Sequence, residues 1–163
     1  MTCAASNELD VMSVDILNAY LQAPSSEKHY IIICLREFGL KNVGKRAIIK
    51  RALYGGKPSG SDFWRHLRSC KDFLGNTSCP TDPIIWMKQA QKDDGIQYWQ
   101  YILLHVDDVL VISHQPKKVI LQEIGKYFVI KPGSLGTPKI YFDNKVPKVT
   151  MDNSVEAWAF SSS

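Results

Sequence analysis

Residues 101–112 form an apolar stretch that is interrupted only by His105 and by the adjacent carboxylates Asp107 and Asp108. The apolar residues on each side are numerous enough for a strand, and the polar centre is short enough for a hairpin turn. Nearly continuous apolarity predicts strands that are buried on both faces of a sheet. The stretch therefore predicts a central hairpin with two aspartates at its tip.

Further elements are predicted around this hairpin. Strands are expected at 10–15, 30–35, 47–49, 84–88, 96–104, 139–142 and 155–160, and helices at 62–74 and 116–128. The first helix is predicted by apolar residues at intervals of three and four, with Ser61 or Asp62 at its start and Gly75-Asn76 at its end. This order of elements favours an α+β fold with an antiparallel sheet over a doubly wound parallel one.

The length of 163 residues, with 45% apolar and 22% charged residues, is typical of one globular domain. The four cysteines and four histidines show no metal-finger spacing. Residues 1–12 include Glu8 and Asp10 and lack the basic and apolar parts of a secretion signal, and no apolar run approaches the roughly 20 residues of a membrane helix. We therefore expect an intracellular protein without a membrane partner; the oligomeric state stays open.

Positive charge is concentrated between Arg36 and Lys71. This segment holds ten basic and two acidic residues, a local balance of +8, which leaves −4 for the rest of a chain whose total is +4. Such a segment favours a polyanionic partner, with solvated surface charges as the alternative. The basic residues are Arg36, Lys41, Lys45, Arg46, Lys50, Arg51, Lys57, Arg65, Arg68 and Lys71.

The two aspartates at the hairpin tip need a compensating charge if they leave water. Residues 93–116 contain no lysine or arginine, so a divalent cation is a natural partner for these hard oxygen ligands. Taken alone, however, an Asp-Asp pair in a hairpin is more often a surface turn.

Three motifs in sequence order carry a resemblance to a known family. His105-Val106-Asp107-Asp108 resembles the Y-x-D-D motif of reverse transcriptases, and residues 15–21, D-I-L-N-A-Y-L, resemble the D-x-x-x-A-F/Y-L motif that supplies another aspartate. Residues 50–64 are similar to the K-x-A-L-Y-G-L-K-Q-A-P-R-x-W segment of copia-type retrotransposon polymerases, and residues 124–128 and 155–163 also resemble that polyprotein. From about residue 10 onward, the chain thus resembles the reverse transcriptase of a copia-type LTR retrotransposon.

The resemblance implies an RNA-directed DNA polymerase whose palm has an antiparallel sheet and flanking helices, with incomplete fingers and thumb. It implies a single domain fragment over 1–163, with palm and part of the fingers at about 10–115 and the start of the thumb or connection region at about 116–163. The implied partners are an RNA or DNA template with its primer and deoxynucleotides. The implied location is a cytoplasmic virus-like particle or the nucleus.

The resemblance also implies residue roles. Asp15, Asp107 and Asp108, with the backbone carbonyl of Ile16, would bind two Mg²⁺ ions, or Mn²⁺ in their place, for attack of the primer 3′-hydroxyl on the α-phosphate of a deoxynucleotide. The nucleotide-binding residues would be Tyr20, which would exclude a 2′-hydroxyl, Gly55 and Gly56. The residues contacting template and primer phosphates would be Lys50, Arg51, Lys57, Arg65 and Arg68. Apart from the family, Tyr20 also fits a core aromatic, and the glycines fit ordinary loop positions.

The chain departs from the family pattern at several points. His105, beside the expected primer terminus, replaces a tyrosine or phenylalanine and adds a group that titrates near neutral pH, and Ser61 stands where an arginine is common. Only fourteen residues precede Asp15, and the chain ends where the family continues into its thumb, connection and RNase H parts. We therefore expect a truncated copy that extends a primer poorly or not at all.

Two alternatives stay open. A noncatalytic remnant would keep the fold and the basic surface and would bind nucleic acid without regard to Mg²⁺ or to Asp15. A nuclease of the RNase H type would also use two metal ions, but such a fold spreads its acidic residues over separate strands and a helix, which disfavours an adjacent pair at a hairpin tip.

Overall fold

The computed structural model of the protein describes residues 4, 7–26, 31–141, 144–150 and 156–159. Contacts between Cα atoms divide the chain into two compact units. Met1–Leu17 and Cys70–Ser163 form the first, which we call the sheet unit, and Asn18–Ser69 form the second, which we call the inserted unit. The two boundaries, after Leu17 and after Ser69, both lie within residues 10–115, the segment that was expected to form the palm and part of the fingers.

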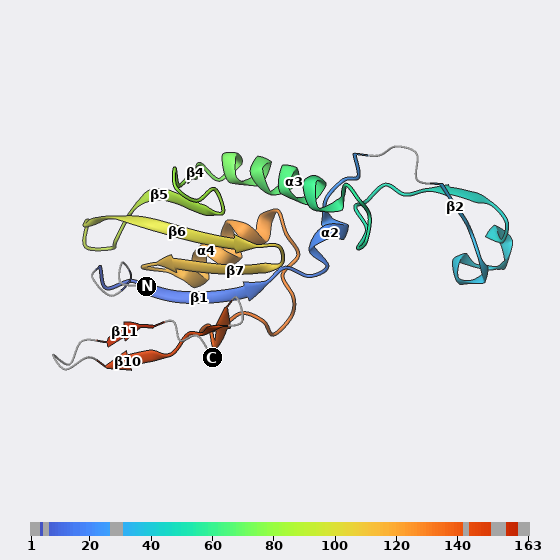
Figure 1. The fold of residues 1–163 in the computed structure, drawn as a ribbon. Coiled ribbons are helices and arrows are strands. Elements are labelled where there is room, and N and C mark those ends of the chain that lie inside the picture. Colours follow the sequence, from blue (N-terminus) through green and yellow to red (C-terminus); the bar gives the residue numbers. More distant parts are fainter. Residues whose placement is uncertain (1–3, 5–6, 27–30, 142–143, 151–155, 160–163) are drawn as a thin grey trace. The chain divides into compact units, whose positions relative to one another are not determined.

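The sheet unit is built on a five-stranded antiparallel sheet with the strand order β1-β7-β6-β5-β4 (Figure 1). The strands are β1 (Asp10–Asp15), β4 (Thr77–Ser78), β5 (Ile85–Gln91), β6 (Gln97–His105) and β7 (Asp108–Ser113). The expected α+β class with an antiparallel sheet is confirmed. The short strand β4 was not expected, because two residues carry no periodic signal.

The strands on either side of the two aspartates differ in burial. All of Val109–Ile112 in β7 is buried, as the continuous apolar pattern predicts. In β6, buried side chains alternate with exposed or half-buried ones, so the prediction of burial on both faces is wrong for this strand. Tyr101 and Leu103 of β6 pack against a cluster of buried apolar side chains and are only partly buried by it.

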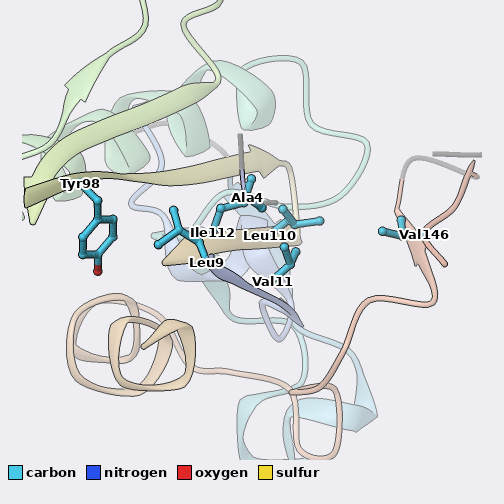
Figure 2. Close-up of a cluster of buried hydrophobic side chains, with 7 residues drawn as sticks. All are labelled: Ala4, Leu9, Val11, Tyr98, Leu110, Ile112 and Val146. Carbon is cyan, nitrogen blue, oxygen red and sulfur yellow. The ribbon is translucent and has the colours of Figure 1, made fainter. Parts of the chain in front are cut away.

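This cluster gathers around the ends of β1 and β7 that lie away from the aspartates. Figure 2 shows Val11 of β1 close to Leu110 and Ile112 of β7, with Leu9 beside them. Ala4, Tyr98 and Val146 complete the buried set. Burial of side chains of this kind stabilises a fold by roughly 1.5 to 3 kcal/mol each. The cluster thereby fixes the two strands that carry the aspartates.

The helix expected at 116–128 is shorter than predicted. Helix α4 (Pro116–Gln122) begins at the expected proline, but a 3₁₀ turn, η3 (Ile124–Lys126), replaces its second half. Ile124 and Phe128 are nevertheless buried, so the apolar spacing predicted the contacts and not the continuous helix. Gly125 accounts for the difference, because glycine is a poor helix former.

Helix α3 (Ser59–Phe73) confirms the helix that was expected at 62–74, although it begins earlier. Because of this earlier start, the expected cap at Ser61 or Asp62 is wrong. The Ser61 hydroxyl donates to the carbonyl of Pro58 at 2.8 Å, and the Asp62 carboxylate accepts from the Ser26 amide at 2.9 Å. The expected end is confirmed by Gly75, whose φ is +69°.

The inserted unit begins with helix α2 (Ala19–Gln22) and contains one small antiparallel pair of strands. These strands are β2 (Ile31–Ile33) and β3 (Arg46–Ile48), joined through the 3₁₀ turns η1 (Arg36–Phe38) and η2 (Leu40–Asn42). They confirm the strands that were expected at 30–35 and 47–49, with residue 30 outside the described part. Ile31, Ile33 and Ile48 are all exposed.

The last part of the chain contributes two further strand pairs to the sheet unit. They are β8 (Ile140–Tyr141) with β9 (Asn144–Lys145) and β10 (Lys148–Thr150) with β11 (Glu156–Trp158). These pairs include the strands that were expected at 139–142 and 155–160; residues 142, 155 and 160 lie outside the described residues. In the part of the chain that the structure describes, no helix is both long and apolar enough to cross a membrane.

Candidate active site

The sheet brings Asp15 next to the hairpin that carries Asp107 and Asp108, although ninety-two positions separate Asp15 from Asp107 in the sequence. Asp15 is the last residue of β1 and lies opposite Asp108, the first residue of β7. The Ile16 amide donates to the carbonyl of Asp107 at 2.7 Å, which ties the end of β1 to the turn itself.

Asp108 also lies opposite His105, the last residue of β6. Residues that face each other across antiparallel strands project from the same face of the sheet, with Cβ atoms about 4.5 to 5.5 Å apart. Asp15, Asp108 and His105 therefore form one row across β1, β7 and β6. Asp108 is half-buried and His105 is exposed.

Val106 and Asp107 form the two-residue loop between β6 and β7. Val106 has a φ of +51° in the left-handed region, which a β-branched side chain rarely adopts. Conformations of this kind cost roughly 1 to 3 kcal/mol and occur preferentially at functional sites. The turn therefore holds the two aspartates at the expense of local strain.

Lys131 is a partner of Asp15 that sequence reasoning missed. Its Nζ atom lies 3.0 Å from Oδ2 of Asp15, and both side chains are partly exposed, at 57% for Lys131 and 38% for Asp15. The hydrogen bond to Asp15 and the negative charge of Asp15, with smaller contributions from Asp107 and Asp108, raise the pKa of Lys131. The ammonium group thus lies within the field of all three carboxylates.

The backbone around Lys131 is also attached to β1. The Lys131 amide donates to the carbonyl of Asp15 at 2.9 Å, and the Asp15 amide donates to Oγ of Ser134 at 3.0 Å. The Ser134 hydroxyl in turn donates to the carbonyl of Lys131 at 2.8 Å. Gly133, with a φ of +77°, provides the turn between them. The only sequence signal was Pro132-Gly133, which predicts a turn without its location.

The three aspartates fit Mg²⁺ or Mn²⁺ in their donor chemistry, because carboxylate oxygens are the ligands that these ions prefer. Ile16 follows directly on Asp15, and its amide is bonded to the aspartate turn. Across the residues with described positions, no three His, Cys, Asp or Glu side chains are grouped closely enough to hold a metal ion as they stand. One oxygen of Asp15 is engaged by Lys131 instead.

Four of the residues predicted to bind nucleotide or nucleic acid line one pocket of the inserted unit. This pocket has a volume of about 320 Å³ and includes Arg51, Gly55, Gly56 and Lys57. A Cβ atom at position 56 would lie only 2.6 Å from Oγ of Ser59, so any larger residue would collide there. Contacts inside the loop are therefore enough to explain a glycine at position 56, without a bound nucleotide.

The other predicted residues of the inserted unit lie outside this pocket. The ring of Tyr20 packs edge-on against Tyr54, with centroids 4.8 Å apart, and against Phe63, at 5.7 Å. This packing is what a core aromatic would show, and a contact with nucleotide stays a prediction. Three of the residues predicted to contact phosphates, namely Lys50, Arg65 and Arg68, lie outside the pocket and are exposed.

A second basic surface, which sequence reasoning missed, lies on the sheet unit. It surrounds a cleft of about 1040 Å³ that includes Asp10, at the end of β1 opposite to Asp15. The cleft contains apolar side chains such as Val11 and Trp158. Its lysines are Lys117, Lys118, Lys139, Lys145 and Lys148. These lysines come from distant parts of the sequence, so no local charge run indicated them.

Comparison of the chain with models of protein families, with curated proteins and with solved structures gave no match.

Proposed function

We propose that the chain is the palm region of a copia-type reverse transcriptase and acts as an RNA-directed DNA polymerase domain. The observation that carries this proposal is the pairing of Asp15 with Asp108 on adjacent antiparallel strands. The three motifs predicted a shared site for these residues, and a surface turn would not require Asp15 to lie beside it. The proposal includes the reverse-transcriptase-like palm as the finer description of the α+β fold.

The residues of the site have distinct tasks in this proposal. Asp15, Asp107 and Asp108 hold two divalent cations, and the carbonyl of Ile16 is a further ligand. When bound, the cations activate the primer 3′-hydroxyl and neutralise charge on the leaving pyrophosphate. The β6–β7 turn and the end of β1 keep the carboxylates in fixed positions, which is the main contribution of a protein to phosphoryl transfer.

The inserted unit supports the nucleic-acid part of the proposal. Its pocket brings Arg51 and Lys57 beside Gly55 and Gly56, which combines positive charge with loop glycines. Basic side chains bind phosphates without regard to base sequence, as a polymerase requires. Template, primer and deoxynucleotide are the partners that we propose for this surface. Because these partners occur inside cells, we also propose an intracellular location.

The second candidate function is a noncatalytic nucleic-acid-binding remnant. The ion pair between Lys131 and Asp15 favours it, because a lysine can neutralise this carboxylate without a metal ion. The lysines around the cleft of the sheet unit also favour binding of a polyanion that does not depend on the aspartates.

Primer extension on an RNA template tests the proposal. We expect slow, template-directed addition of deoxynucleotides in Mg²⁺ or Mn²⁺, which Asp107→Ala and Asp15→Ala abolish because each removes a metal ligand. Asp93→Ala is the matched control, because Asp93 and Asp94 also form an Asp-Asp pair in a hairpin turn, the one between β5 and β6. Asp93→Ala should leave extension unchanged.

The same protein samples distinguish a polymerase from a noncatalytic nucleic-acid-binding remnant. Salt-sensitive binding of primer and template that neither metal ions nor Asp15→Ala alter, in a chain that adds no nucleotide, would contradict the polymerase function. Extension that survives Asp107→Ala would contradict it as well.

A further inference from the structure

We propose that Lys131 is an internal competitor of the divalent cation: in the free protein its ammonium group occupies a cation position at Asp15, and a metal ion binds there as this ion pair opens. This role rests on the proposed function, because it assumes that Asp15, Asp107 and Asp108 are metal ligands. It adds a regulatory element to that site, namely a positive charge that the chain itself supplies.

The position of the ammonium group supports this role. Nζ of Lys131 lies 3.0 Å from Oδ2 of Asp15, a carboxylate oxygen that a metal ion would otherwise use. Asp107 and Asp108 act electrostatically on the same ammonium group. A lysine and a divalent cation that share the carboxylate of Asp15 repel each other, so each weakens the binding of the other.

The turn around Lys131 makes the competition local. The Lys131 amide bonds to the carbonyl of Asp15, and Ser134 bonds to the amide of Asp15 and to the carbonyl of Lys131. The backbone therefore keeps the side chain within reach of Asp15 even when the ammonium group swings away. A tethered group has a high effective concentration at its partner, so the ion pair forms again whenever the metal ion leaves.

The exposure of Lys131 and Asp15 limits how strongly the ion pair can weaken metal binding. Both partners are partly exposed, at 57% and 38%, so water screens their attraction. Exposed ion pairs of this kind change an equilibrium constant by at most about fivefold. The competition should weaken further at high salt, because the Debye length falls from about 10 Å at 0.1 M to about 3 Å at 1 M ionic strength.

Titration with Mn²⁺ measures the competition without any need for catalysis. The electron paramagnetic resonance signal of free Mn²⁺ gives the bound fraction in the absence of nucleotide and nucleic acid. We expect Lys131→Met to bind Mn²⁺ about two- to fivefold more tightly than the unaltered chain at low salt. The difference should shrink at high salt. Methionine keeps an unbranched stem, and the exposed position tolerates it without loss of the fold.

Three further variants serve as controls. Lys131→Arg keeps the charge and should bind Mn²⁺ like the unaltered chain. Lys117→Met removes an exposed lysine of the same unit at the start of α4, beyond the other end of β7, and should also leave the affinity unchanged. The combined Asp107→Asn and Asp108→Asn variant identifies the site, because it should lose this binding.

The outcomes separate the two proposals. Equal Mn²⁺ affinities of Lys131→Met and the unaltered chain, with binding lost in the double asparagine variant, would overturn the role of Lys131 and leave the metal site of the proposed function intact. Mn²⁺ binding that the double asparagine variant does not reduce, in either the Lys131→Met or the unaltered background, would overturn both.

Discussion

Val106 places backbone strain next to the candidate metal ligands. With a φ of +51°, it occupies a region that glycine enters freely and that a β-branched residue enters at a cost. The neighbouring Asp107 and Asp108 depend on this turn for their positions. Strain at such a place indicates that the conformation of the turn is held by the strands around it and is not chosen by its own sequence.

Replacement of Val106 tests the strain directly. We expect Val106→Gly to raise the free energy of unfolding by about 1 kcal/mol, because glycine adopts a positive φ without a Cβ clash. Val109→Gly is the matched control, because Val109 is fully buried in regular strand β7 and should lose about 2 kcal/mol or more. Urea unfolding provides both values. Equal destabilisation by the two variants would show that Val106 is not strained.

At the residue scale, sequence reasoning predicted that Asp15 would lie beside Asp107 and Asp108, and it missed Lys131. Asp15, Asp107 and Asp108 stand in motifs whose order alone indicated a shared site. Lys131 lies 116 positions from Asp15 and meets it only because residues 129–136 run along β1. The pattern of residues around Asp15 or around Lys131 does not reveal a contact between such distant segments. The sequence therefore indicated a divalent cation as the only partner for the carboxylates.

At the scale of single elements, the first turn of α3 depends on one buried carboxylate. Asp62 is buried, accepts a hydrogen bond from the Ser26 amide at 2.9 Å and lies 3.4 Å from Nη1 of Arg65. Burial raises the pKa of Asp62, but the bonds from Ser26 and the charge of Arg65 lower it more, so the pKa lies below its usual value. The ionised form is therefore favoured by folding.

This shift predicts a pH-dependent loss of stability in Asp62→Asn. Because the folded-state pKa is depressed, the stabilisation is present above the unfolded pKa of about 3.9 and disappears as the pH falls through the folded value. We expect Asp62→Asn to lose about 1 to 2 kcal/mol at pH 7 and to approach the unaltered chain as the pH falls below the depressed pKa of the folded state. Urea unfolding at a series of pH values measures the difference.

Asp72 provides the control on the same helix. Its side chain is 72% exposed and pairs with Lys71 at 3.3 Å, so Asp72→Asn should change stability little at any pH. A loss in Asp62→Asn that stays constant between pH 7 and pH 3 would contradict the role of the ionised carboxylate.

The elements also show where periodicity is informative. Buried positions at intervals of three and four predicted α3 well, and in α4 the same spacing predicted the burial of Ile124 and Phe128 while the helix ended at Gln122. In β6, apolar residues continue onto the face that the buried cluster covers only in part. Burial depends on what packs against an element, which the residues of that element do not specify.

At the scale of the whole molecule, positive charge is present in both units. The basic segment from Arg36 to Lys71 was evident from the sequence, whereas the lysines around the cleft of the sheet unit come together only in the fold. The division of the chain into two units was not expected either. The sequence indicated one core, because no linker of biased composition marks the divisions at residues 17 and 69.

Nucleic-acid binding through the inserted unit predicts a specific salt dependence. We expect Lys57→Gln to weaken binding of a labelled primer and template and to reduce the slope of log affinity against log salt concentration by about 1, because one phosphate contact is lost. Fluorescence anisotropy over a series of KCl concentrations measures both. Lys92→Gln, next to Asp93 and Asp94, is the control and should change neither. If the slope of log affinity against log salt concentration were the same for Lys57→Gln and Lys92→Gln, the bound phosphates would not contact Lys57.

The segment 129–136 has a consequence for association between molecules. As the first strand in the sheet order, β1 would present a row of open backbone groups. The segment covers them through the amides of Leu17 and Lys131 and through both bonds between Ser13 and Gly136. At the opposite side of the sheet, β4 pairs with only Trp86 and Met87 of β5. We therefore expect that a foreign strand would add at β5, away from the carboxylates, and would leave the candidate metal site accessible.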